Sequence, residues 1–83
     1  MSATVVPAPH DPKIRQTIES ALKSARNMGS SQFDLDHFLR YDRRLPLPSD
    51  FRIDIVLKAM RDEQLIIEAQ NKRFYHPEFA PRG

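Results

Sequence analysis

The second half of this chain changes its hydrophobic period once, from the spacing of a helix to that of strands. Between residues 53 and 60 the apolar residues lie three and four apart, and they are Ile53, Val56, Leu57 and Met60. This spacing predicts a helix with one buried face. From residue 65 the pattern becomes two strand-like runs, 65–69 and 73–77, separated by three polar residues. The sequence therefore predicts a helix followed directly by a β-hairpin.

An earlier helix is predicted to start at Asp11 and Pro12, because Asp is a favourable N-cap and Pro is tolerated at the first helical position. Its apolar face consists of Ile14, Ile18, Leu22 and Ala25. Gly29 is expected to end it, since glycine is common just after the last helical residue.

A second helix is predicted from Asp34, as its N-cap, to about Arg43 or Arg44, with Leu35, Phe38 and Leu39 facing inward. Phe33 is expected to be the inward residue of a short strand that precedes this helix and pairs with the hairpin. The prolines within residues 45–48 require a turn. Ser49 is then predicted to cap the third helix, which runs to about Glu63, and Pro77 is expected to end the second strand.

Composition limits the class of protein. The 83 residues have room for one domain, predicted over 11–79, with a disordered or extended arm at 1–10 and a tail at 80–83. The chain has no cysteine, so neither disulfides nor Cys-bound zinc is expected. It has neither a membrane-spanning apolar run nor a secretory signal, which predicts a cytoplasmic protein, or a nuclear one in a eukaryote. Its net charge is only +2.

Three helices followed by a hairpin resemble the winged-helix (winged helix-turn-helix) superfamily over residues 11–79. The junction formed by Ile53, Leu57, Met60 and the pair at 65–66 is similar to the pattern Leu-x-x-Leu-x-x-x-Gly-Leu that is common there, with Gln64 in place of the glycine. The resemblance implies an α+β fold in which a three-helix core is followed by a β-hairpin wing.

The resemblance also implies binding to double-stranded DNA, as a small transcriptional regulator that could form a homodimer. In DNA-binding members the third helix enters the major groove and the hairpin tip touches the backbone or minor groove. By position, the groove-facing residues would be Ser49, Arg52, Asp54, Lys58 and Arg61. The hairpin would contribute Gln70, Asn71, Lys72 and Arg73. Further phosphate contacts would come from Arg40, Arg43 and Arg44.

The outward face of the third helix favours a different function. It carries Asp50, Asp54 and Asp62 among its cations, whereas a phosphate-facing surface needs an excess of positive charge. The alternative is a winged-helix module that binds another protein, as an adaptor or as a subunit of a larger complex. Phe51 and Ile55 would then contact the partner. Phe51 could instead fold back locally onto Leu45 or Leu47.

No catalytic or metal site is predicted. The three histidines, at positions 10, 37 and 76, lie in three different elements and lack the spacing of a zinc pair. The acids of residues 34–37 are interpreted as helix-start carboxylates. His37 and Tyr41 are four residues apart and are expected to pack on each other. With two glycines and no phosphate-binding motif, the chain is not expected to be an enzyme or to carry a cofactor.

Overall fold

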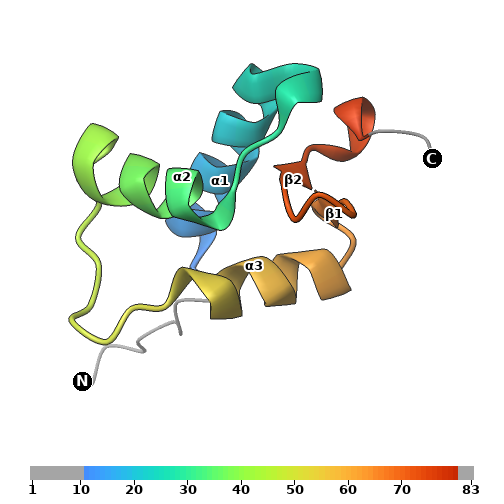
Figure 1. Cartoon of the computed structure of the whole chain (residues 1–83). Coiled ribbons are helices and arrows are strands. Elements are labelled where there is room, and N and C mark those ends of the chain that lie inside the picture. The colour runs from blue at the N-terminus through green and yellow to red at the C-terminus, as the bar shows by residue number, and fades with distance from the viewer. Residues whose placement is uncertain (1–10, 81–83) are drawn as a thin grey trace.

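The computed structural model describes residues 11–80 and shows a small α+β domain of three helices and a two-stranded antiparallel hairpin (Figure 1). The predicted arm at 1–10 and the last three residues of the predicted tail lie outside the described residues. The main helices and strands are α1 (Pro12–Ala25), α2 (Gln32–His37), the π-helix η3 (Phe38–Asp42), α3 (Ile53–Asp62), β1 (Ile67–Glu68) and β2 (Phe74–Tyr75). Two 3₁₀ turns, η2 (Arg26–Met28) and η4 (Pro77–Phe79), complete the chain.

Helix α1 begins as predicted. The Asp11 side chain accepts a hydrogen bond from the Lys13 amide at 2.9 Å, and Pro12 is the first helical residue. The α-helix ends at Ala25, earlier than expected, because Arg26 takes a φ of 53°. The turn η2 follows, and Gly29 ends that turn with a φ of 66°.

Helix α2 starts three residues earlier than predicted, and its cap is Ser31 rather than Asp34. The Ser31 hydroxyl accepts from the Asp34 amide at 3.1 Å, while the Asp34 carboxylate accepts from the Ser31 amide at 3.4 Å. This reciprocal pair is a capping box. Asp34 is therefore the third helical residue, where it satisfies a free amide at the helix start.

Helix α2 continues without a break into the π-helix η3. The end of η3 at Asp42 lies close to the predicted end of the second helix at Arg43 or Arg44. The Arg43 amide donates to the Phe38 carbonyl at 2.9 Å, five residues back. The Leu45 amide then donates to the Leu39 carbonyl at 3.0 Å, and between them Arg44 has a φ of 50°. This left-handed residue turns the chain into the proline-containing segment.

Helix α3 starts at Ile53, three residues later than predicted, and Arg52 occupies the N-cap position without a side-chain cap. Ser49 is not a cap. It lies in a turn that is closed by a hydrogen bond from the Phe51 amide to the Pro48 carbonyl at 3.1 Å. The prolines in this segment favour extended backbone and so delay the helix.

The end of α3 carries a left-handed residue at a position where glycine is generally the most favourable residue. Gln64 has a φ of 64°, and its amide donates to the Arg61 carbonyl at 2.9 Å. The Leu65 amide donates to the Met60 carbonyl at 2.9 Å. These two bonds form a Schellman motif, so Gln64 performs the glycine's role at a conformational cost.

The hairpin is shorter than predicted but has the predicted loop. The paired strand residues are only two on each side, in the register Ile67 with Tyr75 and Glu68 with Phe74. The loop of residues 70–72 is closed by a hydrogen bond from the Lys72 amide to the Ala69 carbonyl at 2.9 Å, and Lys72 has a φ of 65°. A three-residue loop with a left-handed last residue is common in hairpins.

The prediction that Pro77 ends the second strand is wrong. The strand stops at Tyr75, and Pro77 is instead the first residue of η4. The ring nitrogen Nδ1 of His76 caps this turn by accepting a hydrogen bond from the Glu78 amide at 3.2 Å.

The expected pairing between the segment before α2 and the hairpin is present, but through Ser30. The Ser30 amide donates to the Phe74 carbonyl at 2.9 Å, and the Phe74 amide donates to the Ser30 carbonyl at 2.8 Å. Phe33, which was expected to face inward here, is 76% exposed on α2. A single bridging residue therefore joins the hairpin to the start of α2.

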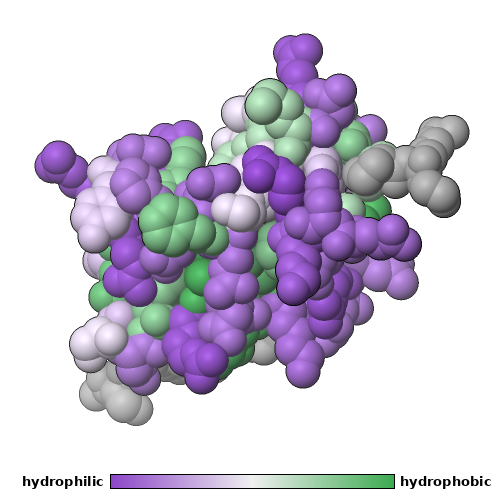
Figure 2. All heavy atoms as spheres, viewed as in Figure 1, coloured by the Kyte–Doolittle hydropathy of each residue, from purple (hydrophilic) through white to green (hydrophobic). Residues whose placement is uncertain are grey.

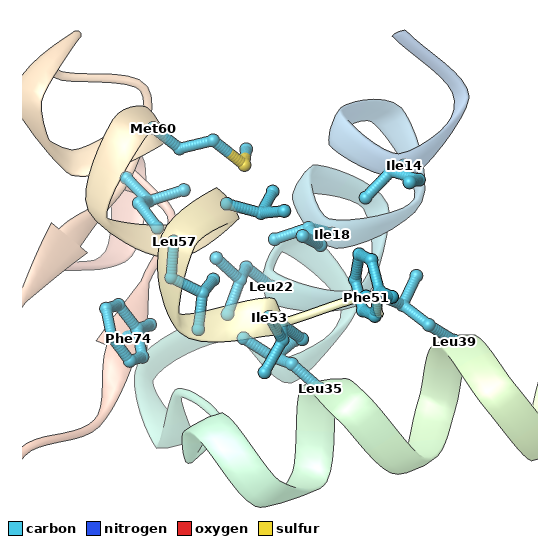
Figure 3. Close-up of a cluster of buried hydrophobic side chains, with 12 residues drawn as sticks. Ile14, Ile18, Leu22, Leu35, Leu39, Phe51, Ile53, Leu57, Met60 and Phe74 are labelled. Atoms are coloured by element: carbon cyan, nitrogen blue, oxygen red, sulfur yellow. The ribbon is translucent and has the colours of Figure 1, made fainter. Parts of the chain in front are cut away.

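The core lies between the three helices and the hairpin (Figure 3). Its buried members are Ile14, Ile18, Leu22, Leu35, Leu39, Phe51, Ile53, Val56, Leu57, Met60, Ile66 and Phe74. Among residues 11–80, no buried side-chain nitrogen or oxygen lacks a hydrogen-bond partner. None of the helices in this range combines the length and apolarity needed to cross a membrane.

An ion pair outside the core connects the first and third helices. The Arg15 guanidinium on α1 donates hydrogen bonds to both carboxylate oxygens of Glu63, just after α3. The hydrogen bond with Glu63 raises the pKa of Arg15 above its ordinary value, against the opposing effect of desolvation.

Candidate interaction surface

The cations predicted to read DNA from the third helix are mostly paired with acids of the same chain. The Arg52 guanidinium lies 2.9 Å from the Asp54 carboxylate. Arg61 donates to Glu68 on β1 and lies 3.9 Å from Asp62. Within residues 11–80, Lys58 is the one cation on this helix without an acidic partner. Ser49 is exposed in the preceding turn rather than on the helix.

The hairpin tip presents Lys72 and Gln70 to solvent, whereas Asn71 and Arg73 have structural contacts. The Asn71 side chain accepts from the Arg73 amide and donates to the Tyr75 hydroxyl, both at 3.0 Å. The Arg73 side chain reaches back to the segment before α2. There it donates to the Met28 carbonyl at 3.0 Å and to the Gly29 carbonyl at 3.2 Å.

The arginines near the end of the second helix differ in their surroundings. Arg40 pairs with Asp36 at 3.0 Å, and its guanidinium lies 5.6 Å from the centre of the Phe51 ring. Arg43 lies 5.3 Å from the centre of the Phe38 ring. Arg44 is exposed at the left-handed position that ends η3.

The two apolar residues predicted to contact a protein partner lie in different environments. Phe51 is only 7% exposed and belongs to the core cluster, against which Leu45 and Leu47 also pack. Phe51 is therefore part of the main core, and this side chain is not available to a partner. Ile55 is 47% exposed on α3.

The most prominent exposed feature is a line of three aromatic rings along α2 and η3, which we call the aromatic ladder: Phe33, His37 and Tyr41. The ring centroids of Phe33 and His37 lie 6.5 Å apart, and those of His37 and Tyr41 lie 4.8 Å apart. Phe33 is 76% and Tyr41 is 64% exposed. Figure 2 shows hydrophobic surface over α2 among hydrophilic side chains. The expected contact between His37 and Tyr41 is confirmed.

The change from α-helix to π-helix keeps the ladder straight. Four residues overshoot one turn of an α-helix, which takes 3.6 residues, so Phe33 and His37 are slightly offset around the axis. Four residues fall short of the wider turn of a π-helix, so Tyr41 is offset from His37 in the opposite direction. The two offsets compensate, and the three rings share one face.

A hollow of about 530 Å³ lies along one side of the ladder, between α1 and α2. Small residues of α1, Ser20, Ala21 and Ser24, form one wall, and Phe33 and Phe38 lie on the other. The small side chains leave room that a bulkier residue would fill. The ladder is therefore accessible from its side as well as from above.

The charges beside the ladder are ordered along the helix. Asp34 and Asp36 flank its first half, while Arg40 and Arg43 flank its second half, together with one acid, Asp42. Sequence reasoning missed this surface because it placed Phe33 in a strand. The signal was nevertheless present in three aromatic residues that follow one another at intervals of four.

The described residues hold no group of three or more His, Asp or Glu side chains that could bind a metal ion.

Comparisons with protein families, with curated proteins and with solved structures find no match to this chain.

Proposed function

We propose that this chain is a winged-helix protein-interaction module whose contact surface is the aromatic ladder. Two features support the winged-helix layout. Helix α3 is followed directly by the hairpin, and Ser30 forms an isolated antiparallel β-bridge with Phe74 of β2. Because one architecture serves many functions, the proposal rests on the surface rather than on the layout.

The observation that carries the proposal is the exposure of these neighbouring rings. Single exposed apolar residues are normal on protein surfaces, but contiguous ones mark interaction sites. Aromatic side chains are enriched at the centres of protein interfaces, where they contribute much of the binding energy. Phe33 and Tyr41 are not needed to fill the core of this domain, because both are largely exposed.

The electrostatics of α3 also favour a protein partner over DNA. An exposed ion pair contributes at most about 1 kcal/mol, so Arg52 and Arg61 could leave their acids to bind phosphate. The carboxylates of Asp54, Asp62 and Glu68 would nevertheless stay on or beside the same face. Their repulsion would oppose the approach of a phosphate backbone.

The test replaces Tyr41 with the photo-reactive residue p-benzoylphenylalanine, which conserves an aromatic ring, in cells that produce the protein. The proposal predicts a cross-linked product of defined mass upon irradiation. That product should disappear when Phe33→Asp is added, because a charge then interrupts the ladder. It should persist with Ile55→Asp, which places the same charge at an exposed site on α3. Absence of any product that depends on Phe33 would contradict the proposal.

DNA binding is a second candidate, as a transcriptional regulator that contacts double-stranded DNA through α3 and the hairpin. It is favoured by Lys58 and Lys72, which are exposed on these two elements and form no ion pair within residues 11–80. Affinity for a random-sequence duplex should then fall steeply between about 50 and 200 mM salt. Replacing both lysines with Ala should reduce the slope of log K against log salt by about 2. Undetectable binding at the lower salt concentration would exclude this candidate.

A further inference from the structure

The charges beside the aromatic ladder are complementary to those of a second, antiparallel copy of the same helix. The first half of the ladder is flanked by Asp34, which lies 4.0 Å from Arg73 of the hairpin, and by Asp36, and its second half by Arg40 and Arg43. Two copies of such a helix attract each other when they run antiparallel, because each acidic half then faces a basic half. Parallel copies would instead place like charges side by side.

The aromatic residues have the same symmetry. Positions 33 and 41 are equally distant from position 37, so a two-fold axis beside His37 brings Phe33 of one copy next to Tyr41 of the other. The two His37 rings then meet at the axis. A two-fold interface of this kind is self-complementary, and it would cover all three rings of both copies.

The flanking charges fall into register under the same axis. Asp36 of one copy comes within reach of Arg40 of the second copy, and both residues already pair within one chain at 3.0 Å. The four side chains can therefore form a single alternating network. Asp34 comes level with the guanidinium of Arg43 of the second copy, since that group lies over the Phe38 ring. Asp42 is the one acid in the basic half.

We infer that the partner of the aromatic ladder is a second copy of this chain, packed antiparallel about a two-fold axis at His37. The inference rests on the proposed function and names its partner. One helix face from each copy makes a smaller contact than the standard interface, which buries about 800 Å² per partner. The dimer should therefore be in rapid exchange with the monomer at micromolar concentrations.

The main test is sedimentation velocity of the full chain between about 5 and 500 µM, a range that brackets micromolar dissociation constants. The wild-type protein should shift from monomer to dimer across this range. Asp36→Arg alone and Arg40→Asp alone should each weaken the dimer at least about tenfold, because like charges then face each other. An equimolar mixture of the two variants should dimerise again, since one face is then basic and the other acidic.

Orientation is tested by cross-linking, which is straightforward because the chain has no cysteine. His37→Cys should form a disulfide-linked dimer rapidly under mild oxidation, since position 37 meets its own copy at the axis. Lys58→Cys is the matched control, because Lys58 is exposed on α3 away from the ladder, and it should cross-link slowly. Equal rates for the two variants would overturn the inference, and so would a monomer at every concentration.

The photo-crosslinking described above separates failure of this inference from failure of the proposed function. If the protein stays monomeric but Tyr41 cross-links in a Phe33-dependent manner to a protein of another mass, the ladder binds a different partner and only the dimer is wrong. If no Phe33-dependent product forms and the protein stays monomeric, both proposals are wrong. Circular dichroism of each variant establishes that it is folded before its result is interpreted.

Discussion

Gly29 and Gln64 both have a positive φ, but only one of the two positions requires glycine. Gly29 has a φ of 66° and a ψ of −172°, a combination that is essentially restricted to glycine. Gln64 has a φ of 64° at the end of α3, where a side chain is tolerated at a cost. Gly29 is thus required by its conformation, whereas Gln64 is only accommodated.

Replacing Gly29 with Ala should lower the free energy of unfolding by about 2–4 kcal/mol, from backbone strain together with overpacking. The added Cβ would lie 2.6 Å from Cε2 of Tyr75 and 2.8 Å from the Phe74 carbonyl oxygen. Urea denaturation measures the change. Gln64→Ala is the control, because it introduces no new strain, and it should change stability little. A Gly29→Ala protein as stable as the wild type would contradict this account.

Replacing Gln64 with Gly should raise the free energy of unfolding by about 0.5–1 kcal/mol, because relief of the left-handed strain exceeds the extra entropy of glycine in the unfolded chain. For a domain of this size the thermal midpoint should rise by about 4 °C. Gln70→Gly in the hairpin loop is the matched control. Gln70 has no positive φ, so its replacement should be neutral or destabilising. Equal effects at both positions would argue against relief of strain.

At the scale of elements, the hairpin is held to the helices by few contacts. Its two strands have two paired residues each, and the bridge to Ser30 adds one more pair. Polar side-chain connections are made by Arg61 of α3 with Glu68 of β1, and by Arg73, which donates to the carbonyls of Met28 and Gly29 and lies 4.0 Å from the Asp34 carboxylate. Two adjacent cations at the hairpin, Lys72 and Arg73, therefore have different roles although their sequence context suggests the same one.

Replacing Arg73 with Ala should lower the free energy of unfolding by about 1–2 kcal/mol, because two carbonyls lose a charged hydrogen-bond donor at a partly exposed site. Lys72→Ala is the control and should change stability by less than about 0.5 kcal/mol, since its side chain is exposed and without a partner in the described residues. Thermal unfolding followed by circular dichroism measures both. Equal effects would show that the Arg73 contacts do not stabilise the hairpin.

At the scale of the whole molecule, the sequence predicted those features that depend on residues close together in the chain. The Asp11 cap, the loop at 70–72 and most of the apolar helix faces are set by neighbouring residues, and the structure confirms them, except that Phe38 lines the hollow instead of joining the core cluster. The pairing of Ser30 depends on how distant segments pack, whereas the late start of α3 follows from the prolines that precede it. Phe51 illustrates the limit for the candidate site. The helical spacing places Phe51 on the outward face of the third helix. Because α3 begins only at Ile53, Phe51 lies before the helix, and the helical period does not determine its burial.

The contrast between Phe51 and Phe33 tests this division between core and surface. Phe51→Ala should lower the free energy of unfolding by about 3 kcal/mol, a large part of the stability of so small a domain. Phe33→Ala should change it by less than about 0.5 kcal/mol, because that ring is mostly exposed. Chemical denaturation compares them, and Phe51→Leu serves if the Ala variant does not fold. A larger loss at Phe33 than at Phe51 would contradict the placement of both rings.

The Ser30–Phe74 bridge has a practical consequence for experiments in solution. Ser30 immediately precedes the cap of α2, and Phe74 lies in the strand that follows the hairpin loop. The Phe74 amide hydrogen therefore sits between the two surfaces that a ligand would occupy, without belonging to either. Its exchange rate with deuterated solvent, followed by NMR, provides a single reporter of opening at this junction. Binding at the ladder and binding at the hairpin can both be followed by the amide resonance of Phe74, which is not itself a contact residue of either surface.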